Sequence, residues 1–598
     1  MIQTSLRKSV LAVPLAAMAM AVTSAYAAPV VGPSGSTFYT LPSPLPAGNH
    51  GDLLSYRSTT ANLGVGAPAT KAWNVLYQST DSIGATNVVS GSVLVPSAAW
   101  AGTGPRPVIL YAVGTHGLAQ NCAPSRQFEN GTDYENANIV AALKAGYAVL
   151  VTDYQGYMTG DAPTYLAGQS QGQAVLDIFK AATSIPSVGI SPSAKAAIWG
   201  YSQGGQSAAW AAELLSTYAP DLNVVGVAAG GIPGDFIKTS LNLNGNLGFG
   251  FLASGIIGLH QQYPLEIPVD LVATDAGKAA LEVIKSQCVF PALLGHLNQN
   301  ITEYTIPGVT LEKLENIASV RDDLLAQNLG NNKVPVPLYQ YHGQADEFIP
   351  LDQDIALKKA YCSKFSKVTF DVYPSEHIVT QFQAAPTVLA WLGDRFAGKA
   401  ASDTCSTTAA EPQSTANPGG GNYVVSLKSW PLAATVGLKT LGQTVTMPST
   451  STFTAQTDIT AKTLTGSMSV PDFKQTLKII GIPAQVGLRI APVGATTGTA
   501  SLDNDGQLHV HGTAYANITV TSVLGIPFGE CKTVTPVAFP LNFDGPISSL
   551  GNGGLTFAGT TTFPQIKGCI ISAILSSLMS GPGQTYSFTV SPPAPVKY

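Results

Sequence analysis

A serine stands between two glycines in the stretch Gly200-Tyr201-Ser202-Gln203-Gly204. The motif alone is weak evidence in a chain with 60 glycines, where an ordinary Gly/Ser turn is the alternative. However, KAAIWG before it is typical of a strand and QSAAWAAELLSTY after it is typical of a helix. At such an elbow the small flanking residues let the backbone turn sharply and expose the hydroxyl. We therefore predict that Ser202 is a nucleophile and that the backbone N–H of Gln203, at the start of the helix, stabilises an oxyanion.

A serine hydroxyl reacts only when a base takes its proton and a third group orients that base. With a nucleophile elbow, the acid and the histidine are expected later in the chain, in that order and each just after a strand. The strand VPLYQYHG runs into Asp346, and the strand KVTFDVY runs into His377. Ser202, Asp346 and His377 are therefore the predicted triad.

Other acidic residues near these two strands are weaker candidates. Glu347 follows Asp346 directly. Asp352 and Asp354 lie past a proline and are expected at the start of the next helix. Glu376 adjoins the predicted base and is expected to face solvent.

Several histidines compete with the predicted base. His342 lies inside the strand before the acid, and His116 lies in VGTHGL after the strand PVILYAV. A loop at the latter position supplies the second oxyanion donor in folds with this elbow, so we assign it to the backbone around Thr115. His509 and His511 would share one face of a strand and could bind a metal, but no third ligand is evident. We therefore favour a solvated pair and predict no metal site.

The elements that must position these residues alternate from about 106 to 396. Apolar runs such as PVILYAV and AVLVTDY are separated by helix-like segments such as NIVAALKAG and GQAVLDIFKAA. This alternation predicts βαβ units and a buried parallel sheet, an α/β fold. The stretch 232–332 breaks the rhythm, and we expect it to be a mainly helical insertion above the sheet.

The composition changes after residue 405. Residues 406–421 are small and polar with prolines and a glycine triplet, which marks a linker. Segments beyond it, such as FTAQTDITAKTLTGSMSV, are rich in Thr and Val, and they predict an all-β domain over 422–598. Its one helical candidate, 570–578, is too short to span a bilayer. Because every predicted catalytic residue lies upstream, we expect this domain to be separable, and a tether to a surface or lipid particle is one hypothesis for its role.

Residues 1–27 have the pattern of a secretory signal peptide. Arg7 and Lys8 precede an apolar stretch, and Ala25-Tyr26-Ala27 offers a cleavage site. The stretch is short for a membrane anchor, so we predict a secreted protein without a transmembrane segment. A formal net charge of −5, with 11% charged residues, gives no electrostatic reason to expect a nucleic-acid partner.

Six cysteines in an exported chain predict disulfides. Cys531 and Cys569 both fall in the predicted all-β domain, so we expect them to pair with each other. The other four allow three pairings, among which these observations do not choose: Cys122, Cys288, Cys362 and Cys405.

Five stretches resemble the secretory lipase family of Candida-type yeasts and actinobacteria: GTHGLAQNCAPS, WGYSQGGQSAAWAA, GGIPGDF, HGQADEFIP and EHIVTQFQAAPTVLAWLGDRF. They extend over nearly all of the region from about 35 to 400, whereas the last 175 or so residues are additional to the family. The resemblance implies an α/β-hydrolase with a helical cap over residues 28–405, acting on carboxylic esters without a cofactor.

Carried over position by position, the resemblance supports Ser202, Asp346 and His377 as the triad, with Gln203 and the Thr115 loop as the oxyanion hole. It also implies two disulfides, Cys122–Cys288 and Cys362–Cys405.

The leading hypothesis is a secreted serine esterase or lipase that forms an acyl-enzyme on Ser202 and cleaves acylglycerols or other lipid or polyester-type esters. A peptidase on the same fold would usually carry a propeller or a repeated domain, and the sequence has no such repeat. An inert surface or adhesion protein predicts a broken triad, whereas all three members have candidates here.

The apolar segment 247–259, LGFGFLASGIIGL, supports two hypotheses. It can be a buried cap helix packed on the core. It can instead line an acyl tunnel or form a lid near the mouth of the site, since its glycines permit movement and leave room for a chain.

Overall fold

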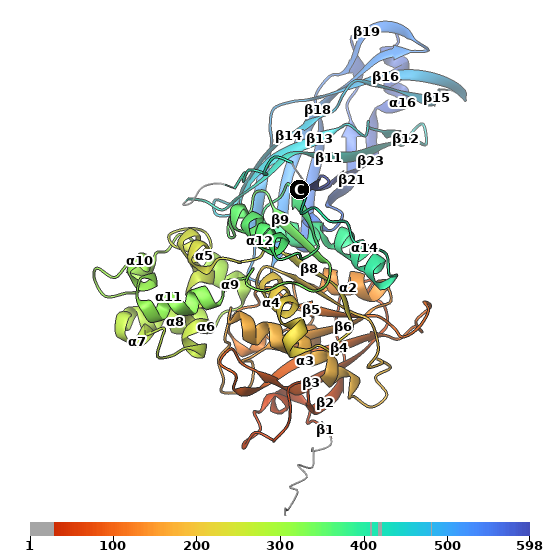
Figure 1. Cartoon of the computed structure of the whole chain (residues 1–598). Coiled ribbons are helices and arrows are strands. Elements are labelled where there is room, and N and C mark those ends of the chain that lie inside the picture. Colours follow the sequence, from red (N-terminus) through yellow and green to blue (C-terminus); the bar gives the residue numbers. More distant parts are fainter. Residues whose placement is uncertain (1–28, 407–408, 417–420, 480) are drawn as a thin grey trace, which may run out of the picture.

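The computed structural model describes residues 29–406, 409–416, 421–479 and 481–598 (Figure 1). The predicted signal peptide at 1–27 and parts of the predicted linker lie outside the described residues. The chain forms a broad lower part, here called the α/β body (residues 29–405), and an elongated upper part, the β arm (residues 422–595) (Figure 1).

The α/β body is built on an eleven-stranded sheet. Strands β6, β5, β7, β8, β9 and β10 are parallel in that spatial order, and β2, β3 and β4 extend the sheet antiparallel on one side. Every residue of β5, β6, β7, β9 and β10 is buried, as expected for parallel strands with both faces covered. The strands are β1 (Val30–Val31), β2 (Leu53–Thr59), β3 (Thr70–Thr80), β4 (Thr86–Pro96), β5 (Val108–Ala112), β6 (Ala148–Tyr154), β7 (Ala196–Tyr201), β8 (Val224–Gly230), β9 (Leu338–Gly343), β10 (Val368–Tyr373) and β24 (Val596–Lys597).

Helices cover this sheet in two pairs. α3 (Gly168–Thr183) and α4 (Gln203–Tyr218) pack against each other and against the central strands. α2 (Asn136–Lys144) likewise packs against α14 (Ala385–Phe396). The remaining helices of this part are α1 (Pro124–Asn130), α12 (Leu351–Ser363) and α13 (His377–Gln383).

The region between β8 and β9 is helical and projects to one side of the sheet (Figure 1). The expected helical insertion is therefore confirmed, and we call it the cap. Its helices are α5 (Phe236–Leu243), α6 (Phe249–Gln262), α7 (Val269–Val272), α8 (Asp275–Lys285), α9 (Val289–Leu294), α10 (Leu311–Glu315) and α11 (Ala318–Ala326).

The β arm is a second, antiparallel sheet of thirteen strands, which confirms an all-β region after the α/β fold. Burial alternates along its strands, as in β14, so that one face of each strand encloses an apolar core. The strands are β11 (Val424–Leu438), β12 (Gln443–Thr446), β13 (Thr452–Asp458), β14 (Thr463–Ser469), β15 (Phe473–Ile479), β16 (Ile482–Pro492), β17 (Thr496–Leu502), β18 (Gln507–Val523), β19 (Ile526–Thr533), β20 (Val537–Pro546), β21 (Leu555–Phe563), β22 (Ile566–Lys567) and β23 (Gly581–Val590).

Two short helices complete the arm, α15 (Ser548–Gly551) and α16 (Ser572–Met579). The latter lies where the sequence suggested the one helical candidate. None of the helices in the described ranges is long and apolar enough to cross a membrane.

The β arm is fastened to the α/β body at several points. β24 leaves the arm and pairs antiparallel with β10, and the ring of Tyr598 packs on Phe370. α15 lies so close to α13 that a Cβ on Gly551 would stand 2.6 Å from the carbonyl oxygen of Val379. The last residues of the chain thus return to the first sheet, and the separability expected for 422–598 stays a prediction.

Replacing Gly551 by valine is expected to destabilise the protein by about 1–3 kcal/mol, the usual cost of overpacking a close contact. Asn552→Val is the matched control, because Asn552 is the exposed neighbour. Thermal unfolding and hydrogen exchange of the α13 amides measure the effect. Equal unfolding midpoints and equal exchange in both variants would contradict the close packing of α15 on α13.

Candidate active site

Ser202 lies on a strained backbone that close packing holds in place. Between β7 and α4 it has φ 60° and ψ −123°, and such a conformation costs a non-glycine residue about 1–3 kcal/mol. A Cβ on Gly200 would stand 2.0 Å from the carbonyl oxygen of Gly204, and a Cβ on Gly204 would stand 2.0 Å from that of Ala112. The glycines of the motif are therefore required by the sharp turn that presents the serine.

A continuous chain of hydrogen bonds joins Ser202, His377 and Asp346. Nε2 of His377 lies 2.9 Å from Oγ of Ser202, and Nδ1 of the same ring lies 2.6 Å from Oδ2 of Asp346. The three residues follow β7, β10 and β9 at the carboxyl ends of parallel strands. The structure thus brings all three residues of the predicted triad together, and their catalytic roles stay a prediction.

The carboxylate of Asp346 is held in one orientation by its surroundings. Its Oδ1 accepts the N–H groups of Phe348 at 3.0 Å and Ile349 at 2.8 Å. Burial alone would raise the pKa of Asp346, but the rings of His377 and His342 and these N–H groups lower it below its ordinary value. The ionised carboxylate is therefore available to accept the Nδ1–H of the histidine.

His342 extends this chain of hydrogen bonds, although no role was predicted for it from the sequence. Its buried ring places Nδ1 2.6 Å from Oδ2 of Asp354 and Nε2 3.5 Å from Oδ2 of Asp346. Burial alone would lower the pKa of His342, but the two carboxylates raise it to about 9. Its spacing of four residues from the acid was the one signal available in the sequence. The ring lies behind Asp346 and helps to position it.

The loop after β5 lies against the serine. Thr115 lines the same pocket as Ser202, and its Oγ1 lies 2.6 Å from the hydroxyl of Tyr165. Gln203 is the first residue of α4, and the N–H groups of a first helical turn have no partner inside the helix. Both groups predicted for an oxyanion hole are therefore beside the serine.

His116 supports this loop from within the protein. Nε2 of His116 lies 2.9 Å from Oδ2 of Asp133, Nδ1 lies 3.0 Å from the carbonyl oxygen of Gly114, and the carbonyl oxygen of His116 accepts the N–H of Val289 from the cap. Burial opposes protonation, but Asp133 raises the pKa of His116 to about 9. The buried ion pair fits the interpretation that His116 holds the loop rather than acting as the base.

The structure contains three disulfides, and each has the expected pairing. The first closes the contact between the Thr115 loop and the cap. The pairs are Cys122–Cys288, Cys362–Cys405 and Cys531–Cys569.

The pocket above the serine has a volume of about 30 Å³. Besides Ser202, His377 and Thr115, its lining comes from the cap and nearby loops: Tyr134, Phe251, Val289, Phe290, Leu293, Phe348, Ile378 and Gln381. The β arm supports one wall, since a Cβ on Gly506 in the β17–β18 turn would stand 2.3 Å from the ring of Phe290.

Glu376 is buried, so the expectation that it faces solvent is wrong. Its carboxylate accepts the N–H groups of Ile378 at 2.7 Å and Val379 at 2.8 Å and thereby caps α13. Burial, the largest effect, raises the pKa of Glu376 to about 7. The carboxylate of Glu347 accepts the N–H of His377 at 3.2 Å, and burial raises its pKa as well. Both acids fix the start of α13.

The histidine pair of the β arm has an acidic partner. Nδ1 of His509 and Nε2 of His511 lie 2.7 Å and 3.1 Å from the same Oδ1 of Asp544. The sequence offered no third ligand, because Asp544 reaches the pair only through the pairing of β18 with β20. In this hydrogen-bonded cluster at the surface, the ring nitrogens of the two histidines and the carboxylate oxygen of Asp544 lie close to one another.

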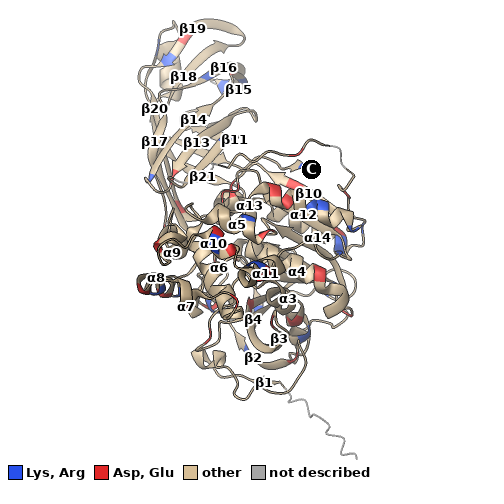
Figure 2. Ribbon diagram, turned by 60° about the vertical axis from the view of Figure 1, so that its left-hand side comes forward, with Lys and Arg blue, Asp and Glu red and all other residues tan. Residues whose placement is uncertain are grey.

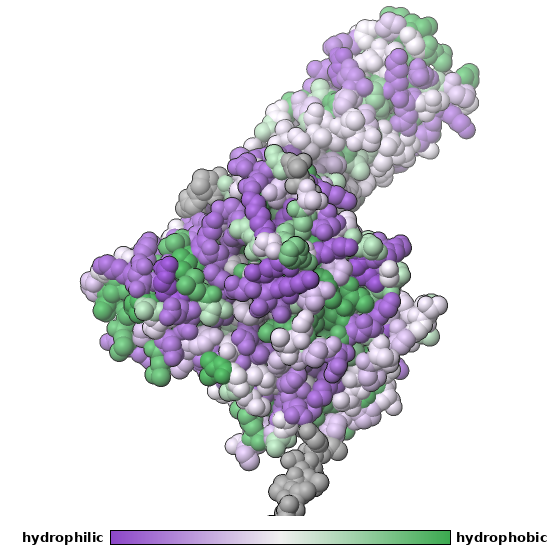
Figure 3. Space-filling view, viewed as in Figure 1, coloured by the Kyte–Doolittle hydropathy of each residue, from purple (hydrophilic) through white to green (hydrophobic). Residues whose placement is uncertain are grey.

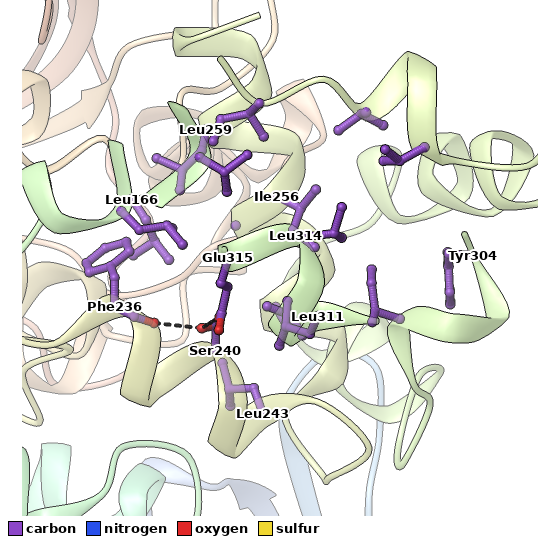
Figure 4. Close-up of a pocket in the computed structure, with 18 of the residues that line it drawn as sticks. Leu166, Phe236, Ser240, Leu243, Ile256, Leu259, Tyr304, Leu311, Leu314 and Glu315 are labelled. Atoms are coloured by element: carbon purple, nitrogen blue, oxygen red, sulfur yellow. Dashed lines mark hydrogen bonds between the residues drawn. The ribbon is translucent and has the colours of Figure 1, made fainter. Parts of the chain in front are cut away.

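The apolar segment 247–259 is part of the cap, and its predicted role in binding an acyl chain stays a prediction. It forms most of α6, and Gly250 packs on α9 of the cap so tightly that a Cβ would stand 1.9 Å from the carbonyl oxygen of Ala292. On another side, Ile256 faces a cavity of about 110 Å³ lined by the cap helices (Figure 4). Phe251 lines both this cavity and the pocket above the serine.

Comparisons with known proteins identify similar chains. The family model described as Secretory lipase matches residues 124–404. Lipase 2 of Candida albicans is 30% identical over 410 residues, which cover 63% of this chain and 83% of that protein. A Mycobacterium tuberculosis protein named probable inactive lipase is 31% identical over 389 residues, which cover 62% and 84%.

A solved structure has the same fold as the α/β body. Candida antarctica lipase A superposes with a TM-score of 0.56 at 23% identity, over 64% of this chain and 90% of that one. This likeness establishes an α/β-hydrolase fold.

The protein is expected to become less stable as the pH rises, because of His342. Its pKa is about 9 in the folded protein against 6.5 ordinarily, so folding favours the protonated ring. The stabilisation is complete below pH 6.5 and is lost as the pH rises to 9, on the order of 3 kcal/mol.

The variant His342→Gln lacks this titrating group. Its unfolding midpoint should therefore decline less than that of the wild type between pH 6.5 and 9, as measured by thermal unfolding. The same decline in both proteins would show that His342 takes up no proton on folding.

Proposed function

Since this chain belongs to the secretory lipase family, we propose that it hydrolyses carboxylic esters with Ser202 as the nucleophile. The chain is an ester hydrolase of the lipase class. What we propose in addition is the serine mechanism. The hydrogen-bond chain from Ser202 through His377 to Asp346 is the observation that carries it.

In the proposed mechanism, Oγ of Ser202 attacks the acyl carbonyl carbon while Nε2 of His377 takes the hydroxyl proton. The carbonyl electron pair moves onto oxygen, where the N–H groups of Gln203 and the Thr115 loop stabilise it. Collapse of the intermediate breaks the ester C–O bond, and the alcohol leaves with the proton from His377. Asp346 accepts the Nδ1–H throughout and stabilises the imidazolium form.

The resulting acyl-enzyme is cleared by water. His377 takes a proton from the water as its oxygen attacks the acyl carbon, and the second collapse returns the proton to Oγ of Ser202. The products are a carboxylic acid and an alcohol.

We expect the acyl chain of the substrate to bind in the cap cavity. The path from Ser202 passes Phe251, which lines both spaces. Leu166, Ile256 and Leu259 line the cavity (Figure 4). The one polar contact drawn there is a hydrogen bond from the Ser240 hydroxyl to the Glu315 carboxylate, so these two groups are paired with each other. Burial contributes about 0.8 kcal/mol per methylene, so this cavity favours long acyl chains.

The tip of the β arm suits contact with a lipid phase. Charged side chains are few along the middle of the arm and gather near its far end (Figure 2). Hydrophobic side chains are also exposed at that end (Figure 3). The exposed apolar residues of the tip are Ile482, Leu524, Ile526, Ile570 and Ile574. Together with the leader pattern at 1–27 and the family, this supports an extracellular enzyme that works at lipid surfaces.

Ser202→Ala and His377→Ala are each expected to lower kcat for p-nitrophenyl butyrate about a thousandfold or more, and Asp346→Asn somewhat less. The exposed Ser216 and Asp352 provide matched controls, as Ser216→Ala and Asp352→Asn, which should keep full activity. Initial rates of hydrolysis are compared among the wild type, the three variants and the two controls. Their unfolding midpoints establish that each protein is folded.

Residual activity above about a tenth of wild type in Ser202→Ala would mean that another residue is the nucleophile. Loss of activity in Asp352→Asn but not in Asp346→Asn would overturn the assignment of the acid. One relative is named inactive, and full inactivity of the wild type would favour the inert alternative.

A further inference from the structure

A row of apolar cavities runs along the inside of the β arm. The first, of about 50 Å³, lies at the end near the α/β body, and the next two have about 20 Å³ each. Adjacent cavities share walls: Met447 lines the second and the third, and four residues line both the first and the second, namely Phe453, Leu541, Phe557 and Val590. The row therefore follows the arm from its base toward α16, whose Met579 lines the third cavity.

The first cavity adjoins the pocket of Ser202. Glu376, which directly precedes the catalytic-site histidine, lines this cavity together with Tyr423. The ring of Tyr423 lies 6.4 Å from that of Phe348, and Phe348 lines the pocket of the serine. Ile547 also lines the cavity, and its N–H donates to Gly506, the glycine that touches the pocket wall.

The pocket of the serine has the cap cavity on its other side. Phe251 lines both, and its ring meets that of Phe348 edge to face at 5.3 Å. The cap cavity and the first cavity of the β arm therefore lie on two sides of the pocket of Ser202. Aromatic side chains stand at the two junctions, Phe251 on one side and Phe348 with Tyr423 on the other.

We propose that the β arm binds a long alkyl chain of the substrate, on the side of the ester opposite to the chain held in the cap. The substrate class is then an ester with long apolar chains on both its acid and its alcohol side. This inference rests on the proposed function, because it takes Ser202 as the point where the ester bond lies.

The chemistry of the lining favours an alkyl chain over a polar ligand. Apart from Glu376, Tyr423 and Thr457, the first cavity is lined by aliphatic and aromatic side chains, and the next two are wholly so. A chain must widen this narrow row, and methionines, which line the second and third cavities, adapt their shape easily.

Photocrosslinking tests the proposal without relying on catalysis. Full-length Ser202→Ala protein is mixed with hexadecyl palmitate, dispersed in detergent, that carries a diazirine at the far end of either its alcohol or its acyl chain. Illumination and peptide mapping should place one probe in residues 424–590 and the other in the cap. Labels from both probes confined to the cap or the outer surface of the protein would overturn the proposal.

A filled cavity provides the second measurement. Ala455 lines the first cavity, and Ala455→Phe should lower hydrolysis of hexadecyl palmitate at least tenfold relative to p-nitrophenyl butyrate. Gln456→Phe, the exposed neighbour on β13, is the matched control and should leave the ratio unchanged.

An unchanged ratio in folded Ala455→Phe would overturn the proposal. If that variant fails to fold, the crosslinking result decides. Failure of the proposed function can be told apart from failure of this inference. If Ser202 is not the nucleophile, Ser202→Ala keeps its hydrolysis of p-nitrophenyl butyrate, whichever region the probe labels.

Discussion

The imidazole of His377 must be held in one position beside Ser202, and the surrounding groups are arranged to hold it there. His377 is the first residue of α13, so the ring can stand 2.9 Å from Ser202 only if that helix begins at one place. Glu376 caps the helix, Glu347 accepts the N–H of His377, and Asp346 holds its Nδ1. Burying two extra carboxylates is costly, and their fixed hydrogen bonds to the start of α13 offset that cost.

The β arm takes part in the same arrangement. α15 presses on α13, the β17–β18 turn touches a wall of the serine pocket, and β24 joins the central sheet. The core of the arm is continuous with apolar residues of the cap and of α13. The β arm and the elements around the serine are therefore joined by direct packing contacts.

Local patterns revealed the elbow, the order of the triad, the helical cap and the all-β region, because each depends on short stretches of sequence. The sequence missed features that long-range folding creates. Burial of Glu376 follows from the arm covering it, the third group beside His509 and His511 comes from a paired strand, and β24 requires the chain to return across the whole molecule.

We propose that His377 and Asp346 activate Ser202 for covalent chemistry. Mass spectrometry after reaction with a fluorophosphonate tests it most directly, since the reagent phosphonylates an activated serine and releases fluoride. We expect one adduct, on the peptide that contains Ser202, formed rapidly by the wild type and at least about a hundredfold more slowly by His377→Ala. An adduct on a different serine, or equal labelling rates in the two proteins, would contradict it.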